Sequence, residues 1–192
     1  MDEAIAQAMD LFQQRGYDGV GVAELSKKIG ITAPSLYSAF GSKRKLFERV
    51  LERYVKTKGV WFSEALEQGD SLPESISVLL LQAAQVYSAD PKRLGCLVID
   101  GTRNCGDMGA CELAAAMRRA TWDSVRSRIK REEPRLQLEQ IDVLADYVVM
   151  ILVGLSGSAR DGAPVEALQA SAEIAAIGFN QRLQQYAESV RC

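Results

Sequence analysis

Histidine is absent from this chain of 192 residues. The chain therefore lacks the commonest general base and the commonest metal ligand of proteins, and a Ser-His-Asp or Cys-His catalytic site is impossible. It also lacks a phosphate-binding loop of the GxxxxGK pattern. These absences argue against an enzyme, and they leave no indication of a cofactor or a metal centre.

We also expect neither a membrane-spanning segment nor a secretory leader in this sequence. No apolar run approaches the roughly 18 residues that a membrane span needs. Asp2 and Glu3 stand where a secretory signal peptide carries positive charge. We therefore expect a cytoplasmic protein without a membrane partner.

No segment alternates apolar and polar residues as a half-buried strand does. Apolar residues recur instead at intervals of three and four, from Ile5, Met9 and Phe12 at the start to Phe179 and Leu183 near the end. This spacing is typical of amphipathic helices, and glycine or proline separates one such segment from the next. The sequence predicts an all-α protein of about nine helices.

Positive charge is concentrated near the N-terminus, although the whole chain carries a net charge of −2. Residues 1–58 hold ten lysines and arginines against seven acidic residues, a net charge of +3, whereas the remaining residues have a net charge of −5. A basic head attracts phosphate, and an acidic body is repelled by it. The distribution favours an N-terminal part that binds nucleic acid.

Two short helices joined by a glycine turn are predicted within residues 22–40, which is the pattern of a helix-turn-helix. Gly30 ends the first helix, and Thr32 can cap the second. Leu36 and Phe40, four residues apart, face inward, so small and hydroxyl side chains with one tyrosine remain outside. Such a face can approach base edges in the major groove, and the lysines that follow it suit phosphate.

The run from Gly16 to Phe47, GYDGVGVAELSKKIGITAPSLYSAFGSKRKLF, resembles the N-terminal signature of TetR/AcrR-family transcription regulators. It contains a Gly-aromatic pair after the first helix, a Gly-hydrophobic turn, a Leu-Tyr pair, a phenylalanine, and Ser-Lys before an apolar pair. Later segments, Gly95-Cys96-Leu97 and Gly154–Ala163, also look like parts of one branch of this family. The resemblance implies a three-helix DNA-binding head in residues 1–45, and a larger helical bundle for ligand binding and dimerisation in residues 46–192.

The resemblance also implies roles for residues of the head. Ser35 and the region of Thr32 and Ala33 would contact bases, Tyr37 would contact phosphate through its hydroxyl, and Lys43 would bind phosphate. The full set expected to contact double-stranded operator DNA is Thr32, Ala33, Ser35, Tyr37, Ser38, Ser42, Lys43 and Lys45.

Small residues on or beside the apolar stripes of the last two helices indicate that two copies pack closely as a homodimer. Internal packing within one chain is the alternative explanation of the same residues. A two-fold dimer would hold its reading helices about 34–36 Å apart and implies a near-palindromic operator. The expected interface residues are Ile141, Ala145, Val148, Leu152, Leu155, Leu168, Ala172, Ala175, Phe179 and Leu183.

The body is expected to hold a small apolar or amphipathic effector between its middle helices. Effector binding would change the spacing of the two heads through the long helix after Ser42, and so release a repressor from its operator. Pockets are mostly apolar with a few polar anchors, although the same residue types also form plain core. The expected lining is Trp61, Phe62, Tyr87, Val98, Ile99, Thr102, Arg103, Met117, Thr121, Trp122, Val125, Tyr147 and Met150.

Two alternatives stay open at this point. Cys105, Met108 and Cys111 lie within seven residues of one another, with Cys96 nearby, and such sulfur groups could sense copper or an oxidant. Buried cysteines, however, usually behave as small apolar residues. The second alternative is a helical adaptor that binds no DNA, although an adaptor would not need the small exposed face of residues 33–39 followed by lysines.

Overall fold

The computed structural model describes residues 1–90, 92 and 94–189, and its chain divides into two compact units. The first unit comprises Met1–Val60 and Leu94–Arg118, and the second comprises Trp61–Arg93 and Arg119–Cys192. Ten helices and no strand occur in the described part of the chain, which confirms the all-α prediction. The functional boundary expected between residues 45 and 46 stays a prediction.

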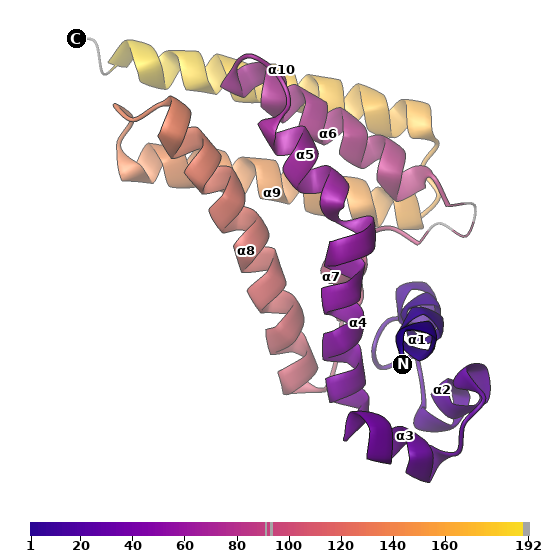
Figure 1. Cartoon of the computed structure of the whole chain (residues 1–192). Helices are drawn as coiled ribbons and strands as arrows, with labels where there is room; N and C mark the ends of the chain where they lie inside the picture. The colour runs from indigo at the N-terminus through magenta and orange to yellow at the C-terminus, as the bar shows by residue number, and fades with distance from the viewer. Residues whose placement is uncertain (91, 93, 190–192) are drawn as a thin grey trace. The chain divides into compact units, whose positions relative to one another are not determined.

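The first unit is built around an aromatic cluster. The rings of Phe12 and Tyr17 are stacked 6.0 Å apart, and Phe47 meets both of them edge-on at 5.0 Å. All three side chains are buried, so the first helix, the following turn and the fourth helix are held together. The helices of this unit are α1 (Asp2–Arg15), α2 (Val22–Ile29), α3 (Ala33–Phe40), α4 (Lys43–Lys58), α7 (Leu97–Asp100) and the beginning of α8 (Met108–Glu132) (Figure 1).

Helix α4 ends earlier than its apolar pattern indicates. The sequence suggests a helix running on through Trp61 towards Leu66, but α4 ends at Lys58 and α5 (Val60–Glu67) begins after Gly59. The Gly59 N–H donates to the carbonyl of Tyr54, five residues back, so the last turn is widened. This break divides one expected helix into two, which explains why the described part of the chain has ten helices rather than about nine.

The second unit is dominated by three helices that pack against one another: α6 (Leu72–Ser88), α9 (Leu138–Arg160) and α10 (Val165–Ser189) (Figure 1). Their apolar stripes meet in a core that includes Leu80, Val148 and Phe179, each at most 1% exposed. Ser71 begins α6 as its N-cap and accepts a hydrogen bond from the N–H of Glu74.

Helix α9 corrects one expectation from the sequence. By length and composition it is apolar enough to cross a membrane, although no segment was expected to reach that size. Asp142 and Asp146 interrupt the run in its first turns, which hides the high mean hydropathy of the helix. Part of this apolar character is used in the core, because Val148 and Leu152 are buried on a helix that packs against α6 and α10.

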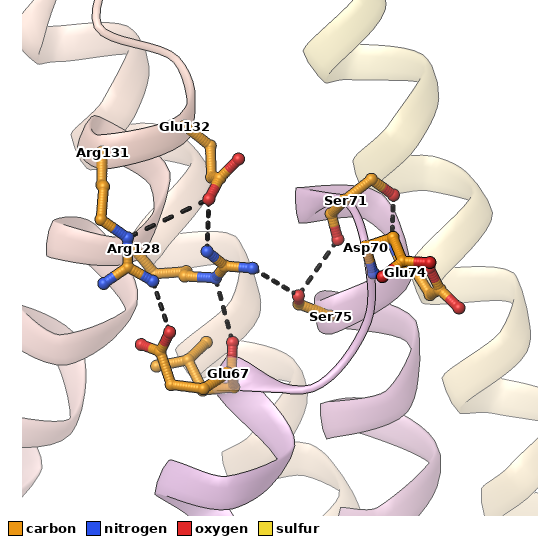
Figure 2. A network of polar contacts seen from close by, with 9 residues as sticks. Glu67, Asp70, Ser71, Glu74, Ser75, Arg128, Arg131 and Glu132 are labelled. Atoms are coloured by element: carbon orange, nitrogen blue, oxygen red, sulfur yellow. Dashed lines mark hydrogen bonds and ion pairs between the residues drawn. The ribbon is translucent and has the colours of Figure 1, made fainter.

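A buried arginine fastens α8 to α5 and α6 within the second unit (Figure 2). Arg128 is 7% exposed; its Nε donates to the carbonyl of Leu66 at 3.1 Å and its Nη2 to Ser75 Oγ at 2.8 Å. The third side of the guanidinium is paired with Glu132. Next to it, Arg131 is paired with Glu67 at the end of α5. A charged group can be buried here because its donors are matched on each side.

We expect Arg128→Ala to lower the free energy of unfolding by about 3 kcal/mol, because it leaves buried oxygens of α5 and α6 without a donor. Urea denaturation followed by circular dichroism measures this loss. Arg135→Ala removes an exposed arginine in the loop after the same helix and serves as the control. Equal stabilities of the two variants would contradict the role given to Arg128.

Candidate nucleic-acid interface

Helix α3 is held so that one face is buried and the other is exposed. Gly30 takes the left-handed conformation (φ 76°, ψ 29°) that ends α2, and Thr32 caps α3 by accepting from the N–H of Ser35 at 3.3 Å. Leu36 and Phe40, at 0% and 3% exposed, anchor the inner face. The outer face is therefore a rigid surface of small and hydroxyl residues rather than part of the core.

Tyr37 is the one large side chain on this outer face. It is 49% exposed, and Ser35, Ser38 and Ala39 beside it are also exposed. An amphipathic tyrosine with a free hydroxyl can donate to an acceptor outside the molecule. The outer face of α3 is thus exposed and unobstructed within the first unit, as entry into a DNA groove requires.

Three consecutive cations begin α4. Ser42 caps the helix by accepting from the N–H of Lys45 at 3.1 Å, and Lys43 and Arg44 occupy its first turn. Cations at this end oppose the helix dipole, and an incoming anion would be attracted by both the charges and the free N–H groups. Partial burial lowers the pKa of Lys43, whose ammonium lies 4.0 Å from the centre of the Tyr17 ring.

The structure brings the expected DNA-contacting residues together on two successive segments. The aliphatic stem of Lys45 lies against Gly41, the left-handed glycine between α3 and α4, so this lysine remains next to the end of α3. Whether the residues contact DNA stays a prediction. Thr32, Ala33, Ser35, Tyr37 and Ser38 belong to the cap and body of α3, and Ser42, Lys43 and Lys45 belong to the start of α4.

Sequence reasoning missed a polar cluster next to these cations. The hydroxyl of Tyr17 donates to the carboxylate of Asp107 at 2.8 Å, and Arg44 lies 3.6 Å from the same carboxylate. Asp18 accepts from the N–H of Gly106 at 2.6 Å. Tyr17 and Asp18 are about ninety positions from their partners in the chain, and Arg44 is also far from Asp107 in sequence, so no local pattern could have revealed the cluster.

The residues expected to line an effector pocket divide between the two units. In the first, Val98 and Thr102 are buried, and Arg103 is paired with Asp100 at 2.9 Å. In the second, the ring of Trp61 meets Tyr87 edge-on at 5.7 Å. The remaining members divide in the same way, with Ile99 and Met117 in the first unit and Phe62, Thr121, Trp122, Val125, Tyr147 and Met150 in the second.

A cavity of about 390 Å³ opens in the second unit between α5 and α8. Phe62 and Leu66 form an apolar part of its wall, and Ser124, Ser127 and Arg131 contribute polar groups. Of the expected lining residues, Phe62 alone belongs to this cavity. Met150 is a correction: it is 63% exposed on α9 and cannot line a closed pocket within the chain.

The expected dimer interface is also corrected by the structure. Its members are at most 4% exposed within a single chain, because the most regular apolar stripe of each helix faces the core. A partner cannot cover side chains that are already covered, so the alternative of internal packing holds for these residues. They are Ile141, Ala145, Val148, Leu152, Leu155, Leu168, Ala172, Ala175, Phe179 and Leu183.

The cysteine alternative finds little support in the described residues. Cys96 is buried, and Cys105 and Cys111 are close, the thiol of Cys111 lying 3.3 Å from the carbonyl of Cys105. Burial, followed by the nearby Cys111 and Asp18, raises the pKa of Cys105 to about 11. A thiol that stays protonated is a weak nucleophile and a weak metal ligand. No group of three metal-ligating side chains forms in this part of the chain, and Cys192 lies outside the described residues.

A short outward helix, preceded by a glycine turn and followed by a lysine-rich helix start, defines a helix-turn-helix protein. Residues 4–50 match the family model described as bacterial regulatory proteins, tetR family. The chain is 34% identical over 184 residues to the HTH-type transcriptional repressor BdcR of Escherichia coli, a match covering 96% of this chain and 91% of BdcR. The chain belongs to the TetR family of bacterial regulatory proteins, as the sequence predicted.

Further relatives agree with this assignment. The chain is 28% identical to the HTH-type transcriptional repressor ComR of Escherichia coli, over 87% of this chain and 82% of ComR. A cysteine mutant of the TetR-family regulator CifR, solved with a 26-bp operator DNA, superposes with a TM-score of 0.82 at 31% identity. That match covers 91% of this chain and 94% of CifR.

We expect Ser42→Ala to lower the free energy of unfolding by about 1 kcal/mol, because it removes the side-chain cap of α4. Thermal or urea unfolding without DNA gives the measurement. Ser38→Ala removes an equally small hydroxyl from the exposed face of α3, where it caps no helix, and should cost nothing. A similar loss in both variants would show that the cap is not what Ser42 contributes.

Proposed function

We propose that the protein acts as a homodimeric repressor in the cytoplasm, binds a near-palindromic operator through α3, and is released by a small apolar or amphipathic effector. It carries out no catalysis in this role. The observation that supports the proposal best is the outward face of α3, held by Leu36 and Phe40 and followed directly by the cations of α4. The operator complex of CifR, a relative at 31% identity, supports the same use of the head.

In the proposed complex, the residues divide by chemistry. Ser35, with Thr32 and Ala33, would meet base edges at the N-terminal end of α3, where short side chains allow a close approach. Tyr37 would donate its hydroxyl to a phosphate. Lys43, with Ser42 and Lys45, would hold the next phosphate at the N-terminus of α4.

The dimer is proposed to use a second, exposed apolar stripe on α9 and α10. Met150 and Val143 on α9 are 63% and 47% exposed, and Ile174 and Ile177 on α10 are 71% and 59% exposed. Tyr147 joins the two helices by donating to the carbonyl of Ala175 at 3.0 Å. Large apolar side chains this exposed are unfavourable in water, and a two-fold partner presenting the same stripe would cover them.

The effector is proposed to act by favouring one spacing of the two heads over another. It must bind the two states with different affinities, since equal affinity shifts nothing. The cavity between α5 and α8, with its apolar wall and polar rim, is the described space that such a ligand could enter.

We expect Tyr37→Ala and Lys43→Ala each to weaken operator binding about three- to tenfold, because each removes a phosphate contact. The probe is a duplex selected by the wild-type protein from a random-sequence pool, and fluorescence anisotropy gives the dissociation constant. Lys43→Ala should also reduce the salt slope by about 1. Lys130→Ala, an exposed lysine of the second unit, is the control, and affinities equal to that control in both variants would refute the assignment.

We expect Ile174→Glu to raise the dimer dissociation constant at least about tenfold, because a carboxylate would be buried without a partner at the proposed interface. Analytical ultracentrifugation measures the change. Val55→Glu introduces the same charge at an exposed apolar position of α4 and should leave the dimer intact. A dimer that tolerates Ile174→Glu as well as Val55→Glu would mean that another surface pairs the subunits.

A further inference from the structure

Within the first unit, the segment between α7 and α8 is bound tightly to the turn that follows α1. The N–H of Tyr17 donates to the carbonyl of Gly101 at 2.7 Å, and its hydroxyl donates to Asp107 at 2.8 Å. Asp18 accepts from the N–H of Gly106 at 2.6 Å. These three hydrogen bonds fix two neighbouring residues of the head to the far ends of one short segment.

Two glycines lie close to other groups at this contact. Gly16 has a positive φ of 70°, and a methyl group on it would lie 3.3 Å from the carbonyl oxygen of Gly101. A methyl group on Gly109 would lie 1.9 Å from an Arg44 nitrogen, because the Arg44 side chain crosses this glycine on its way to Asp107. A side chain at position 109 would therefore require Arg44 to move.

Asp107 has two separate tasks at this point. One carboxylate oxygen accepts from the N–H of Ala110 at 3.2 Å and so caps α8, while the other accepts from the Tyr17 hydroxyl. The ring of Tyr17 in turn supports the ammonium of Lys43 on its face at 4.0 Å. The Asp107 side chain therefore caps α8. Through Tyr17, it also connects the beginning of α8 with the cations at the beginning of α4.

We propose that Asp107 is a positioning residue for DNA binding, which orients Tyr17, Lys43 and Arg44 towards phosphate and joins their position to α8. Asp107 itself touches no DNA in this proposal. Its carboxylate orients the Tyr17 ring, the ring holds Lys43, and the charge of Asp107 holds Arg44.

Because Asp107 lies at the beginning of α8, its contacts with Tyr17 and Arg44 could also transmit the effect of a ligand. This regulatory role rests on the proposed function. Helix α8 runs without a break from Met108 to Glu132. The same helix contributes part of the cavity wall through Asp123, Ser124, Ser127, Arg128 and Arg131. A change in α8 at the cavity would therefore displace the Asp107 contact, and with it the phosphate-binding cations.

The test is a double-mutant cycle on the full chain, with the selected operator duplex as the probe. Asp107→Ser keeps an oxygen that can cap α8 but is too short to reach Tyr17. Tyr17→Phe keeps the ring in the aromatic cluster and removes the hydroxyl. Glu112→Gln is the control for loss of charge, because Glu112 is an exposed carboxylate of α8 without a partner among the described residues.

Each single variant is expected to weaken operator binding about three- to tenfold, and the double variant is expected to bind no more weakly than the weaker single variant. Affinities equal to the wild-type and Glu112→Gln values would overturn the proposal. Additive losses would also overturn it, because the two residues would then act separately. A wild-type protein that selects no duplex at all would instead refute the proposed function.

Hydrogen exchange tests the connection along α8. In the wild-type protein, operator binding is expected to change the exchange rates of amides in residues 119–132, since coupling between two sites is reciprocal. In the double variant this change should disappear, while protection of α3 by DNA persists at saturating duplex. A change at residues 119–132 that survives in the double variant would overturn the route through Asp107.

Discussion

Tyr17 is 4% exposed, and a phenol buried to this extent requires a partner for its hydroxyl. Burial, followed by the Asp107 carboxylate, raises the pKa of Tyr17, so the group remains a neutral donor. The same hydrogen bond is the leading cause that lowers the pKa of Asp107, which remains an ionised acceptor. The aromatic cluster beside this bond fixes α1 to α4, and α3 packs against α2 and α4 with its outer face exposed.

The parts of the head that could be predicted from sequence are those with local signals. Gly30 ends a helix because it tolerates a left-handed backbone, and Thr32 and Ser42 begin helices because their oxygens satisfy free N–H groups. Each of these signals lies within four residues of its effect. The Tyr17–Asp107 bond has no such signal, since it depends on how the chain returns to the head after α6.

The last two helices show a different limit. Both carry two apolar stripes, and the more regular one, with Leu152 and Phe179, forms the core although the sequence predicts it to form the dimer interface. The less regular one, with Met150 and Ile174, is exposed. Periodicity identifies a buried face but does not say whether the same chain or a second one covers it. The more continuous stripe belongs to the core because internal packing must be satisfied along the whole length of a helix.

The cations at the start of α4 make the head less stable when it is free than when it is bound to phosphate. Lys43, Arg44 and Lys45 oppose the dipole of their own helix and repel one another, so their arrangement is unfavourable in the free head. The Tyr17 ring and the Asp107 carboxylate offset part of this cost and keep the side chains in place. A phosphate would offset it more completely, because it also accepts from the free N–H groups of the first turn. The head is therefore stable without DNA and more stable with it. An effector has to oppose this difference in stability.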